Sequence, residues 1–212
     1  MADAARTPCL YVLAGTNGAG KSSIGGAMFR RQGAGYFDPD EAARLILAAN
    51  PGITQAEATS AAWYEGRRLL ERAIAERRTF AFETTLGGRT ITTLLDRALS
   101  EGIEVRIWYV GLGSPDLHIA RVRSRVARGG HDVPDETIRA RYNASRLNLV
   151  HLLPKLTELR VYDNTREADP LAGIAPEPLL ILHVARGAIV SSCDLRLALQ
   201  WSKPILAAAM AR

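Results

Sequence analysis

Lysine is nearly absent from this sequence. Only three of its 27 basic residues are lysines, and the other 24 are arginines. The chain has no lysine-rich tail and no run of five like charges, which argues against a nucleic-acid-binding tail even though the formal net charge is +5. This balance favours a localised site for a small anionic substrate, and neither a nucleic-acid nor a membrane partner is expected.

Long apolar runs, cysteine and histidine are also scarce. Without 18 consecutive apolar residues no membrane span is predicted, and the start "MADAARTP" lacks the apolar core of a secretory signal. We therefore expect a cytoplasmic protein, in which the two cysteines, Cys9 and Cys193, are reduced thiols. The four histidines include no H-x-x-x-H pair, which argues against a zinc site.

Short apolar segments alternate with helical patterns along the chain. Strands are expected at 9–15, 35–38, 79–85, 104–112 and 158–164, and a β-hairpin at 178–191. Helices are expected at about 20–31, 40–50, 54–77 and 89–102, followed by two arginine-rich helices split at Gly129-Gly130 and a short helical tail. Thr54 and Glu57 form a capping box at the third of these helices. This alternation predicts a mainly parallel sheet covered by helices on both faces.

Residues 15–22 read "GTNGAGKS", which satisfies the pattern G-x-x-x-x-G-K-[ST]. An apolar strand precedes the pattern and a helical segment follows it, as in a nucleotide-binding P-loop. Backbone N–H groups of such a loop surround phosphate oxygens, Lys21 reaches the β- and γ-phosphates, and the Ser22 hydroxyl binds Mg²⁺. The predicted nucleotide-binding residues are Gly15, Thr16, Asn17, Gly18, Ala19, Gly20, Lys21, Ser22 and Ser23. The fold class is therefore the three-layer α/β/α P-loop NTPase fold.

Carboxylates follow two of the predicted strands. Asp38 and Asp40 come after the second strand, and Glu83, with Thr84 and Thr85, ends the third. Ligands of open α/β sheets bind at this edge, so we assign helix capping to Asp38, proton transfer to Asp40 and substrate orientation to Glu83. The chain has no N-K-x-D motif of a GTPase, and no D-E pair follows an apolar strand as it does in a hydrolytic motor, which favours a small-molecule kinase.

Five segments occur in order: "AGTNGAGKSS", "FDPDEAARL", "FETTLGGRT", "RVRSRVARGGHDVPDETIRARY" and "YDNT". Together they resemble the zeta toxin family of P-loop kinases, which are related to UDP-N-acetylglucosamine kinases, over about residues 9 to 165. The resemblance implies Mg²⁺-dependent phosphoryl transfer from ATP or GTP to a hydroxyl, in the toxins the 3′-hydroxyl of the amino sugar of UDP-N-acetylglucosamine. An antitoxin protein is a partner that the resemblance allows.

The resemblance also assigns roles to individual residues. It implies that Asp40 is the general base, that Glu83 and Thr85 face the substrate, and that Asn164 lies near the nucleotide. Two arginines would clamp the transferred phosphate; these match Arg128 and Arg141, with Arg125 as an alternative for the first. Arg89 would line the acceptor pocket, although two glycines precede it where the toxins have an arginine directly after E-x-T-L.

The chain as a whole (1–212) is expected to be a single kinase domain, with a lid at about 114–150 and a C-terminal hairpin and tail at about 176–212. Two other functions stay open: a phosphotransferase for an antibiotic, a nucleoside or another metabolite, and a nucleotide-dependent RNA-binding or regulatory module. His131 is expected to support the lid, and Trp63, Trp108 and Trp201 to be core or interface residues.

Overall fold

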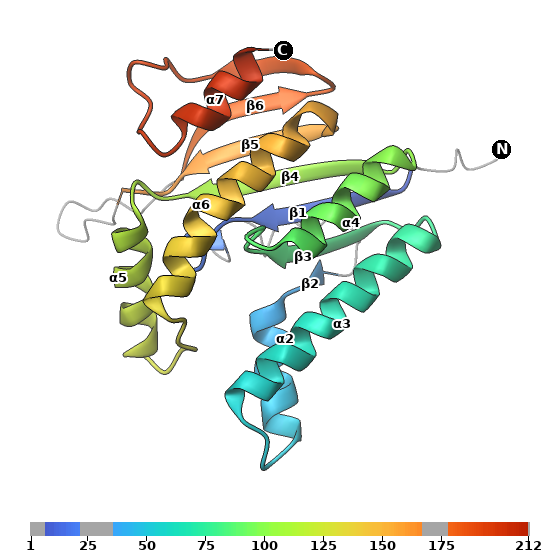
Figure 1. Cartoon of the computed structure of the whole chain (residues 1–212), viewed down its shortest axis with the longest axis vertical. Helices are drawn as coiled ribbons and strands as arrows, with labels where there is room; N and C mark the ends of the chain where they lie inside the picture. The colour runs from blue at the N-terminus through green and yellow to red at the C-terminus, as the bar shows by residue number, and fades with distance from the viewer. Residues whose placement is uncertain (1–6, 22–35, 167–177, 212) are drawn as a thin grey trace.

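The computed structural model describes residues 7–21, 36–166 and 178–211, which form a seven-stranded sheet of order β2-β3-β1-β4-β5-β6-β7 (Figure 1). The first five strands in this order are parallel, and β6 and β7 continue the sheet in antiparallel pairing. The mainly parallel sheet and the C-terminal hairpin predicted from the sequence are therefore confirmed. The strands are β1 (Cys9–Ala14), β2 (Tyr36–Phe37), β3 (Phe80–Thr84), β4 (Glu104–Gly111), β5 (Glu158–Asp163), β6 (Leu179–Ala185) and β7 (Ala188–Ser192).

Helices follow the strands as the sequence pattern predicts. The described helices are α2 (Pro39–Ala49), α3 (Gln55–Ala75), α4 (Arg89–Ser100), α5 (Pro115–Val126), α6 (Asp135–Leu152), η1 (Leu153–Lys155) and α7 (Lys203–Met210). The helix expected at about 20–31 lies outside the described residues, apart from its first positions. Among the described residues no helix has the length and apolar character needed to cross a bilayer.

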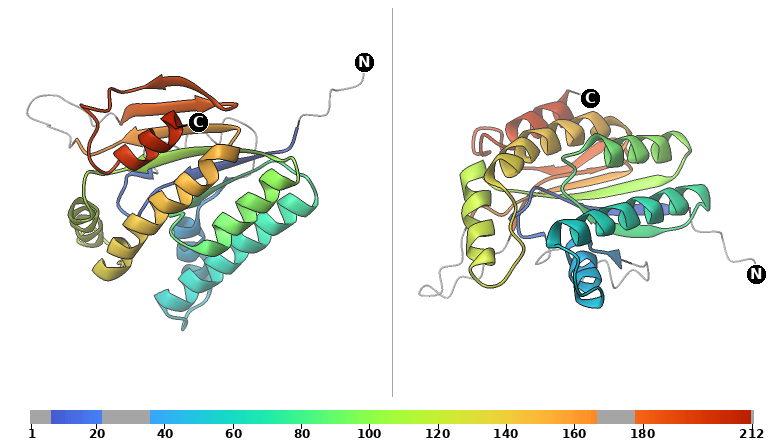
Figure 2. Two further views of the ribbon diagram at one scale, coloured as in Figure 1. Left: turned by 45° about the horizontal axis from the view of Figure 1, so that its top comes forward. Right: turned by 60° about the horizontal axis from the view of Figure 1, so that its bottom comes forward.

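The central strands are buried on both faces, as parallel strands usually are. On one face, alternate residues of β1 (Leu10, Val12 and Ala14) join the main core with residues of α3, α4, α6 and α7, which lie side by side over that face (Figure 2). On the other face Leu13 packs with Trp108 and Val110. Burial on both faces explains why β1 and β4 read as nearly continuous apolar runs.

Two helix starts at the carboxyl edge of the sheet are fixed by caps read from the sequence. Asp38 accepts hydrogen bonds from the backbone N–H groups of Asp40 and Glu41, and Pro39 occupies the first turn of α2. Thr54 and Glu57 form the predicted capping box of α3. The α2–α3 hairpin projects past the β2 side of the sheet, and α5 lies beyond the carboxyl ends of the central strands (Figure 1).

The C-terminal segment completes the core. Trp201 is buried against Gly111, where a Cβ atom would collide with the indole ring, and its Nε1 donates to Asp163 at 3.1 Å. Ile205 and Leu206 of α7 are fully buried in the same cluster. This segment, which carries no recognisable motif, therefore contributes apolar side chains to the core.

Candidate active site

The loop between β1 and Lys21 has the shape of a phosphate cradle. Gly18 has a φ of +80°, and a Cβ atom there would lie 2.6 Å from the carbonyl oxygen of His118. Only glycine meets both demands without strain. The Lys21 ammonium is buried and turned back over the loop, where it donates to the Gly15 carbonyl at 2.7 Å. Ser22 and Ser23, also predicted from the motif, lie outside the described residues.

Glu83 faces the lysine from the end of β3. Its Oε1 lies 3.4 Å from the Lys21 Nζ, and its Oε2 accepts from the Tyr36 hydroxyl at 3.2 Å. Burial raises the pKa of the Glu83 carboxyl, and the nearby Lys21 charge opposes this shift. The parallel pairing of β3 with β1 places this carboxylate beside the cradle.

Asp38 and Asp40 differ as expected. The Asp38 carboxylate caps α2, whereas the Asp40 side chain is half exposed and forms an ion pair with Arg125 at 3.2 Å. Proline at the first helical position directs Asp40 away from the cap. The capping role predicted for Asp38 is confirmed, and the Asp40 carboxylate stays accessible at the cavity wall.

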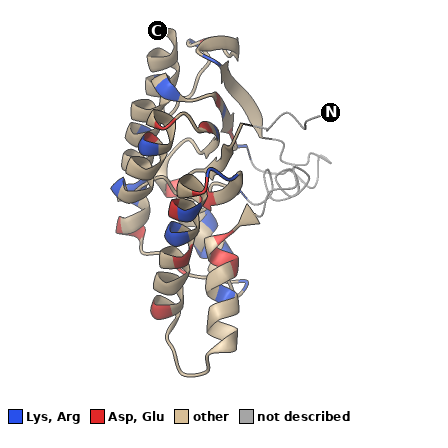
Figure 3. Ribbon diagram, turned by 90° about the vertical axis from the view of Figure 1, so that its right-hand side faces the viewer, with Lys and Arg blue, Asp and Glu red and all other residues tan. Residues whose placement is uncertain are grey.

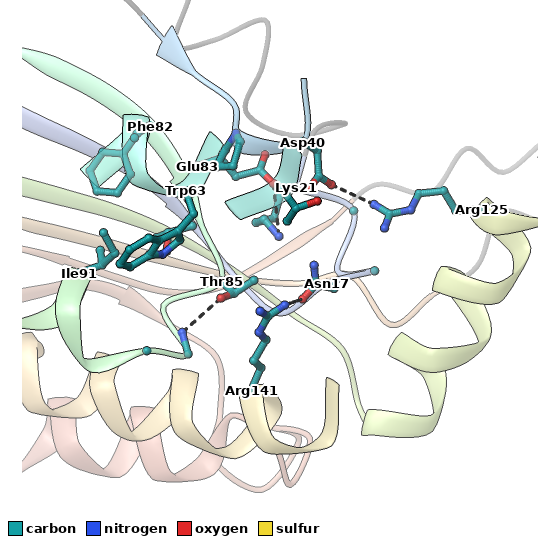
Figure 4. A pocket seen from close by; sticks show the side chains of 18 of the residues that line it. Asn17, Lys21, Asp40, Trp63, Phe82, Glu83, Thr85, Ile91, Arg125 and Arg141 are labelled. Carbon is teal, nitrogen blue, oxygen red and sulfur yellow. Dashed lines mark hydrogen bonds and ion pairs between the residues drawn. The ribbon is translucent and has the colours of Figure 1, made fainter. Parts of the chain in front are cut away.

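The three arginines predicted to bind the transferred phosphate all line the same cavity, and Figure 4 shows two of them, Arg125 and Arg141. Arg125 pairs with Asp40 and also donates to the His131 carbonyl at 2.8 Å. Arg128 is exposed and donates to the backbone and side-chain oxygens of Ser124. Arg141 donates to the Asn17 side chain at 2.9 Å, and burial lowers its pKa. Of the three, Arg141 is the one that donates a hydrogen bond to the described part of the phosphate cradle.

These groups line one cavity of about 920 Å³. The predicted residues that line it are Asn17, Gly18, Gly20, Lys21, Asp40, Glu83, Thr84, Thr85, Arg125, Arg128, Arg141 and Asn164. Gly15, Thr16 and Ala19 shape the cradle behind that surface. Arg89 is exposed at the start of α4 and is not part of the lining, where Gly87, Gly88, Thr90 and Ile91 stand instead.

Asn164 closes the cradle from the end of β5. Its side-chain N–H donates to the Ala19 carbonyl at 2.8 Å, and its backbone carbonyl accepts a hydrogen bond from the Arg121 guanidinium at 2.9 Å. A Cβ atom on Gly20 would collide with the Asn164 amide. Asn164 therefore holds the last turn of the loop in place. Arg121, which sequence reasoning missed, lines the cavity beside it.

His118 is a second residue that the sequence analysis missed. Its ring is only 1% exposed, and its Nδ1 lies 2.8 Å from the Asn17 carbonyl oxygen. Burial lowers the pKa of this imidazole to about 4, so the ring is neutral near pH 7 and donates to the carbonyl. The available signal was helical spacing, because His118 and Val122 are one turn apart and both buried.

The loop from Thr85 to Gly88 is held by α6. Ser145 donates to the Thr85 carbonyl at 2.7 Å, and Asn148 donates to the Leu86 carbonyl at 2.8 Å. Leu86 has a φ of 53° and is fully buried. These bonds hold the loop in a backbone conformation that a leucine seldom adopts. Gly87 follows and packs directly against Arg141.

The fold and the site together define a P-loop α/β protein built like the nucleotide-dependent kinases. The chain belongs to the zeta toxin family, whose profile matches residues 2–169. An uncharacterized protein of Haemophilus influenzae is 30% identical over 132 residues, which cover 60% of this chain and 88% of that protein.

Solved structures show the same fold at low sequence identity. AvrRxo1-ORF1 in its complex with AvrRxo1-ORF2, determined with sulphate ions and also with ATP, aligns with a TM-score of 0.67 at 15% identity. The alignment covers 96% of this chain and 64% of the other, so this chain spans less than two thirds of that relative's length. A structure of the PezAT toxin-antitoxin system of Streptococcus pneumoniae aligns with a TM-score of 0.54 at 19% identity, covering 78% and 72% of the two chains.

Proposed function

We propose that this protein is a kinase that transfers the γ-phosphate of ATP or GTP to a hydroxyl of a small molecule. The observation that carries the proposal is the meeting of Lys21, Glu83 and Asp40 in one cavity with Arg125, Arg128 and Arg141. A buried ammonium at a P-loop binds phosphate, a carboxylate at the wall accepts a proton, and arginines neutralise charge on the transferred group. Membership of the zeta toxin family supports the same reaction.

Each residue has a distinct role in this mechanism. The Asp40 carboxylate removes the proton of the acceptor hydroxyl as its oxygen attacks the γ-phosphorus. The bond to the β-phosphate oxygen then breaks, and the negative charge passes to the departing nucleoside diphosphate. Arg125 is suited to stabilise this negative charge, because its buried Nε–H has no hydrogen-bond partner within the described residues and can still donate. Arg141 would bind the phosphate while keeping Asn17 in place.

The cavity also fits Mg²⁺. Glu83 and Asp40 supply carboxylate oxygens at its wall, and Mg²⁺ bound with a nucleotide takes most of its remaining ligands from phosphates and water. We assign Ser22 as the protein hydroxyl ligand and Glu83 as the carboxylate that orients a bound water. The ion would neutralise charge on the β- and γ-phosphates.

The acceptor proposed on family grounds is the 3′-hydroxyl of a UDP-N-acetyl amino sugar. The chain differs from the family pattern beside that pocket, because Gly87 and Gly88 precede an exposed Arg89. By analogy with the toxin-antitoxin relatives, we also propose an antitoxin protein as a partner. Residues 1–212 would act as one kinase domain, with α5 and α6 in the lid at about 114–150.

The surface charge gives little support to RNA binding. Arg123 pairs with Asp135, and Arg139 pairs with Asp116. Lys and Arg positions are interspersed with Asp and Glu positions along the ribbon in Figure 3. Ion pairs of this kind reduce the attraction for a polyanion. The arginines that line the cavity therefore favour a small phosphorylated ligand.

An acceptor screen tests the proposal. Purified protein with Mg²⁺ and γ-labelled ATP or GTP is incubated with UDP-sugars, nucleosides and aminocyclitols, and mass spectrometry identifies the product. A UDP-N-acetyl amino sugar is expected to receive one phosphate at the 3′-hydroxyl, and Lys21→Ala is expected to abolish the transfer. Equal labelling by wild type and Lys21→Ala would show that the P-loop does not carry the reaction.

A further inference from the structure

The cavity continues past the catalytic groups into an apolar end. Trp63 of α3, Phe82 of β3 and Ile91 of α4 gather there, away from Arg125 and Asn17 (Figure 4). Phe37 of β2 lines the same end. The phosphoryl transfer proposed above uses none of these side chains.

Trp63 stands on a regular face of α3. Thr59, Trp63, Gly66 and Arg67 recur at helical spacing and all four line the cavity. The helix lies close to β2 at this point, because a Cβ atom on Gly66 would lie 2.5 Å from the Phe37 ring. The close packing leaves α3 little freedom to move, so the indole has a defined position at the wall.

The exposure of Trp63 sets it apart from the other two tryptophans. Trp63 is 41% exposed, whereas Trp108 is 5% and Trp201 is 2% exposed. The sequence analysis expected all three in the core or an interface, and the structure places only Trp108 and Trp201 in the core. A large apolar ring open to a cavity gains free energy when a ligand covers it.

The sheet order separates the two ends of the cavity. Trp63 lies on α3, which packs against β3 on one side of β1, and Ile91 lies in the first turn of α4, directly after β3 in the chain, whereas Asn164 follows β5 on the other side of β1. Lys21, Glu83 and Asp40 lie between these ends. Since Asn164 and Arg121 hold the cradle on the β5 side, the donor nucleotide fits that side and the apolar end faces the acceptor.

We propose that Trp63 determines acceptor specificity by stacking on a flat heteroaromatic ring that the acceptor carries at a distance from its reacting hydroxyl. This inference rests on the proposed kinase function. Such a site accepts molecules in which a nucleobase-like ring is linked to the phosphorylated sugar, and it discriminates against sugars and cyclitols that carry no aromatic ring. Phe82 and Ile91 exclude water around the ring, and stacking on an aromatic side chain tolerates several kinds of base.

Binding to the intact protein provides the first test. The protein is saturated with Mg²⁺ and a non-hydrolysable ATP analogue to fill the donor site, and it is then titrated with uridine, adenosine and N-acetylglucosamine. The two nucleosides are expected to quench tryptophan fluorescence saturably, because Trp63 is the exposed indole. N-acetylglucosamine is expected to cause no quenching. Trp63→Phe is expected to lose the quenching but to retain nucleoside binding by calorimetry.

Trp63→Leu tests the energetic contribution of the ring. It is expected to weaken nucleoside binding about tenfold. With the acceptor found in the screen, it is expected to raise KM by a similar factor and to change kcat little. Arg68→Leu is the matched control, because Arg68 lies on the same helix, is exposed, pairs with Glu65 and does not line the cavity. It is expected to leave both quantities unchanged.

The outcomes separate the two proposals. Absence of saturable quenching by either nucleoside, or equal effects of the Trp63→Leu and Arg68→Leu substitutions, would overturn the stacking site even if phosphoryl transfer continued. Failure of the ATP analogue to bind, or transfer that survives Lys21→Ala, would overturn the kinase function itself. The role of Trp63 would also be refuted if the wild-type protein preferred an acceptor without an aromatic ring over acceptors that carry one.

Discussion

The Arg141 guanidinium donates to the side-chain oxygen of Asn17 at 2.9 Å, although 124 positions separate the two residues. The backbone carbonyl of Asn17 is held by His118 at 2.8 Å. Helix α6 thus binds the side chain of one P-loop residue, and α5 binds its main chain. Both arginine-rich helices are fixed to the phosphate cradle through a single residue.

Arg141→Ala is expected to lower kcat for phosphoryl transfer by about 10³-fold, because an arginine that binds the transferred phosphate acts mainly in the transition state. Nucleotide affinity, measured with a fluorescent ATP analogue, is expected to change much less. Arg139→Ala is the control, since Arg139 lies on the same helix but pairs with Asp116 and does not line the cavity. Equal loss in both variants would refute a specific role for Arg141.

Substitution of Asp38 is expected to lower the stability of the fold, whereas substitution of Asp40 is expected to lower the activity. Asp38→Ala removes the cap of α2 and should lower the free energy of unfolding by about 1 kcal/mol while transfer continues. Asp40→Asn should leave unfolding in urea nearly unchanged and lower kcat by about 10²- to 10⁴-fold, as expected for loss of a general base. Transfer near the wild-type rate in Asp40→Asn would exclude Asp40 as the base.

Local patterns predicted much of this protein. The strand alternation, the caps at Asp38 and Thr54 and the glycine spacing of the P-loop each depend on residues close in sequence, so they could be read directly. Glu83 could be predicted at the cavity because the carboxyl ends of parallel strands meet at one edge.

Contacts between distant segments could not be predicted. Neither the 2.8 Å contact of His118 with Asn17 nor the exposed position of Trp63 in the cavity follows from local sequence. Each depends on how a helix is oriented against the sheet, and hydrophobic periodicity does not fix that orientation. Arg89 shows the converse: its neighbours in a motif suggested a cavity position, but the turn at Gly87 and Gly88 leaves its side chain exposed.

Gly87→Ala is expected to impair transfer, whereas Gly88→Ala is not. A Cβ atom at Gly87 would lie 2.8 Å from the Arg141 Cγ, while a Cβ atom at Gly88 has no heavy atom within 4 Å. The Gly87→Ala substitution must therefore displace the arginine or its loop, and kcat should fall about tenfold or more if Arg141 binds the phosphate. Thermal unfolding of both variants would show whether the effect is confined to the site.

Protonation of His118 is expected to destabilise the fold in acid. Burial lowers the pKa of this ring to about 4 from its ordinary value of 6.5. Between these values the unfolded chain binds a proton that the folded protein does not, so the free energy of unfolding falls as the pH falls. The contribution is complete above about pH 6.5 and is lost towards pH 4, with a magnitude of about 3 kcal/mol.

Urea unfolding of wild type and His118→Asn at pH values between about 7.5 and 4.5 measures this contribution. Asparagine keeps a side-chain N–H donor for the Asn17 carbonyl but does not titrate, so the difference in stability between the two proteins should shrink as the pH falls. Other groups, including Glu83 with its raised pKa, titrate in both proteins and cancel in the difference. A difference between wild type and His118→Asn that stays constant across this range would mean that His118 has the same pKa in the folded protein as in the unfolded chain, and a difference that grows as the pH falls would mean that folding raises this pKa.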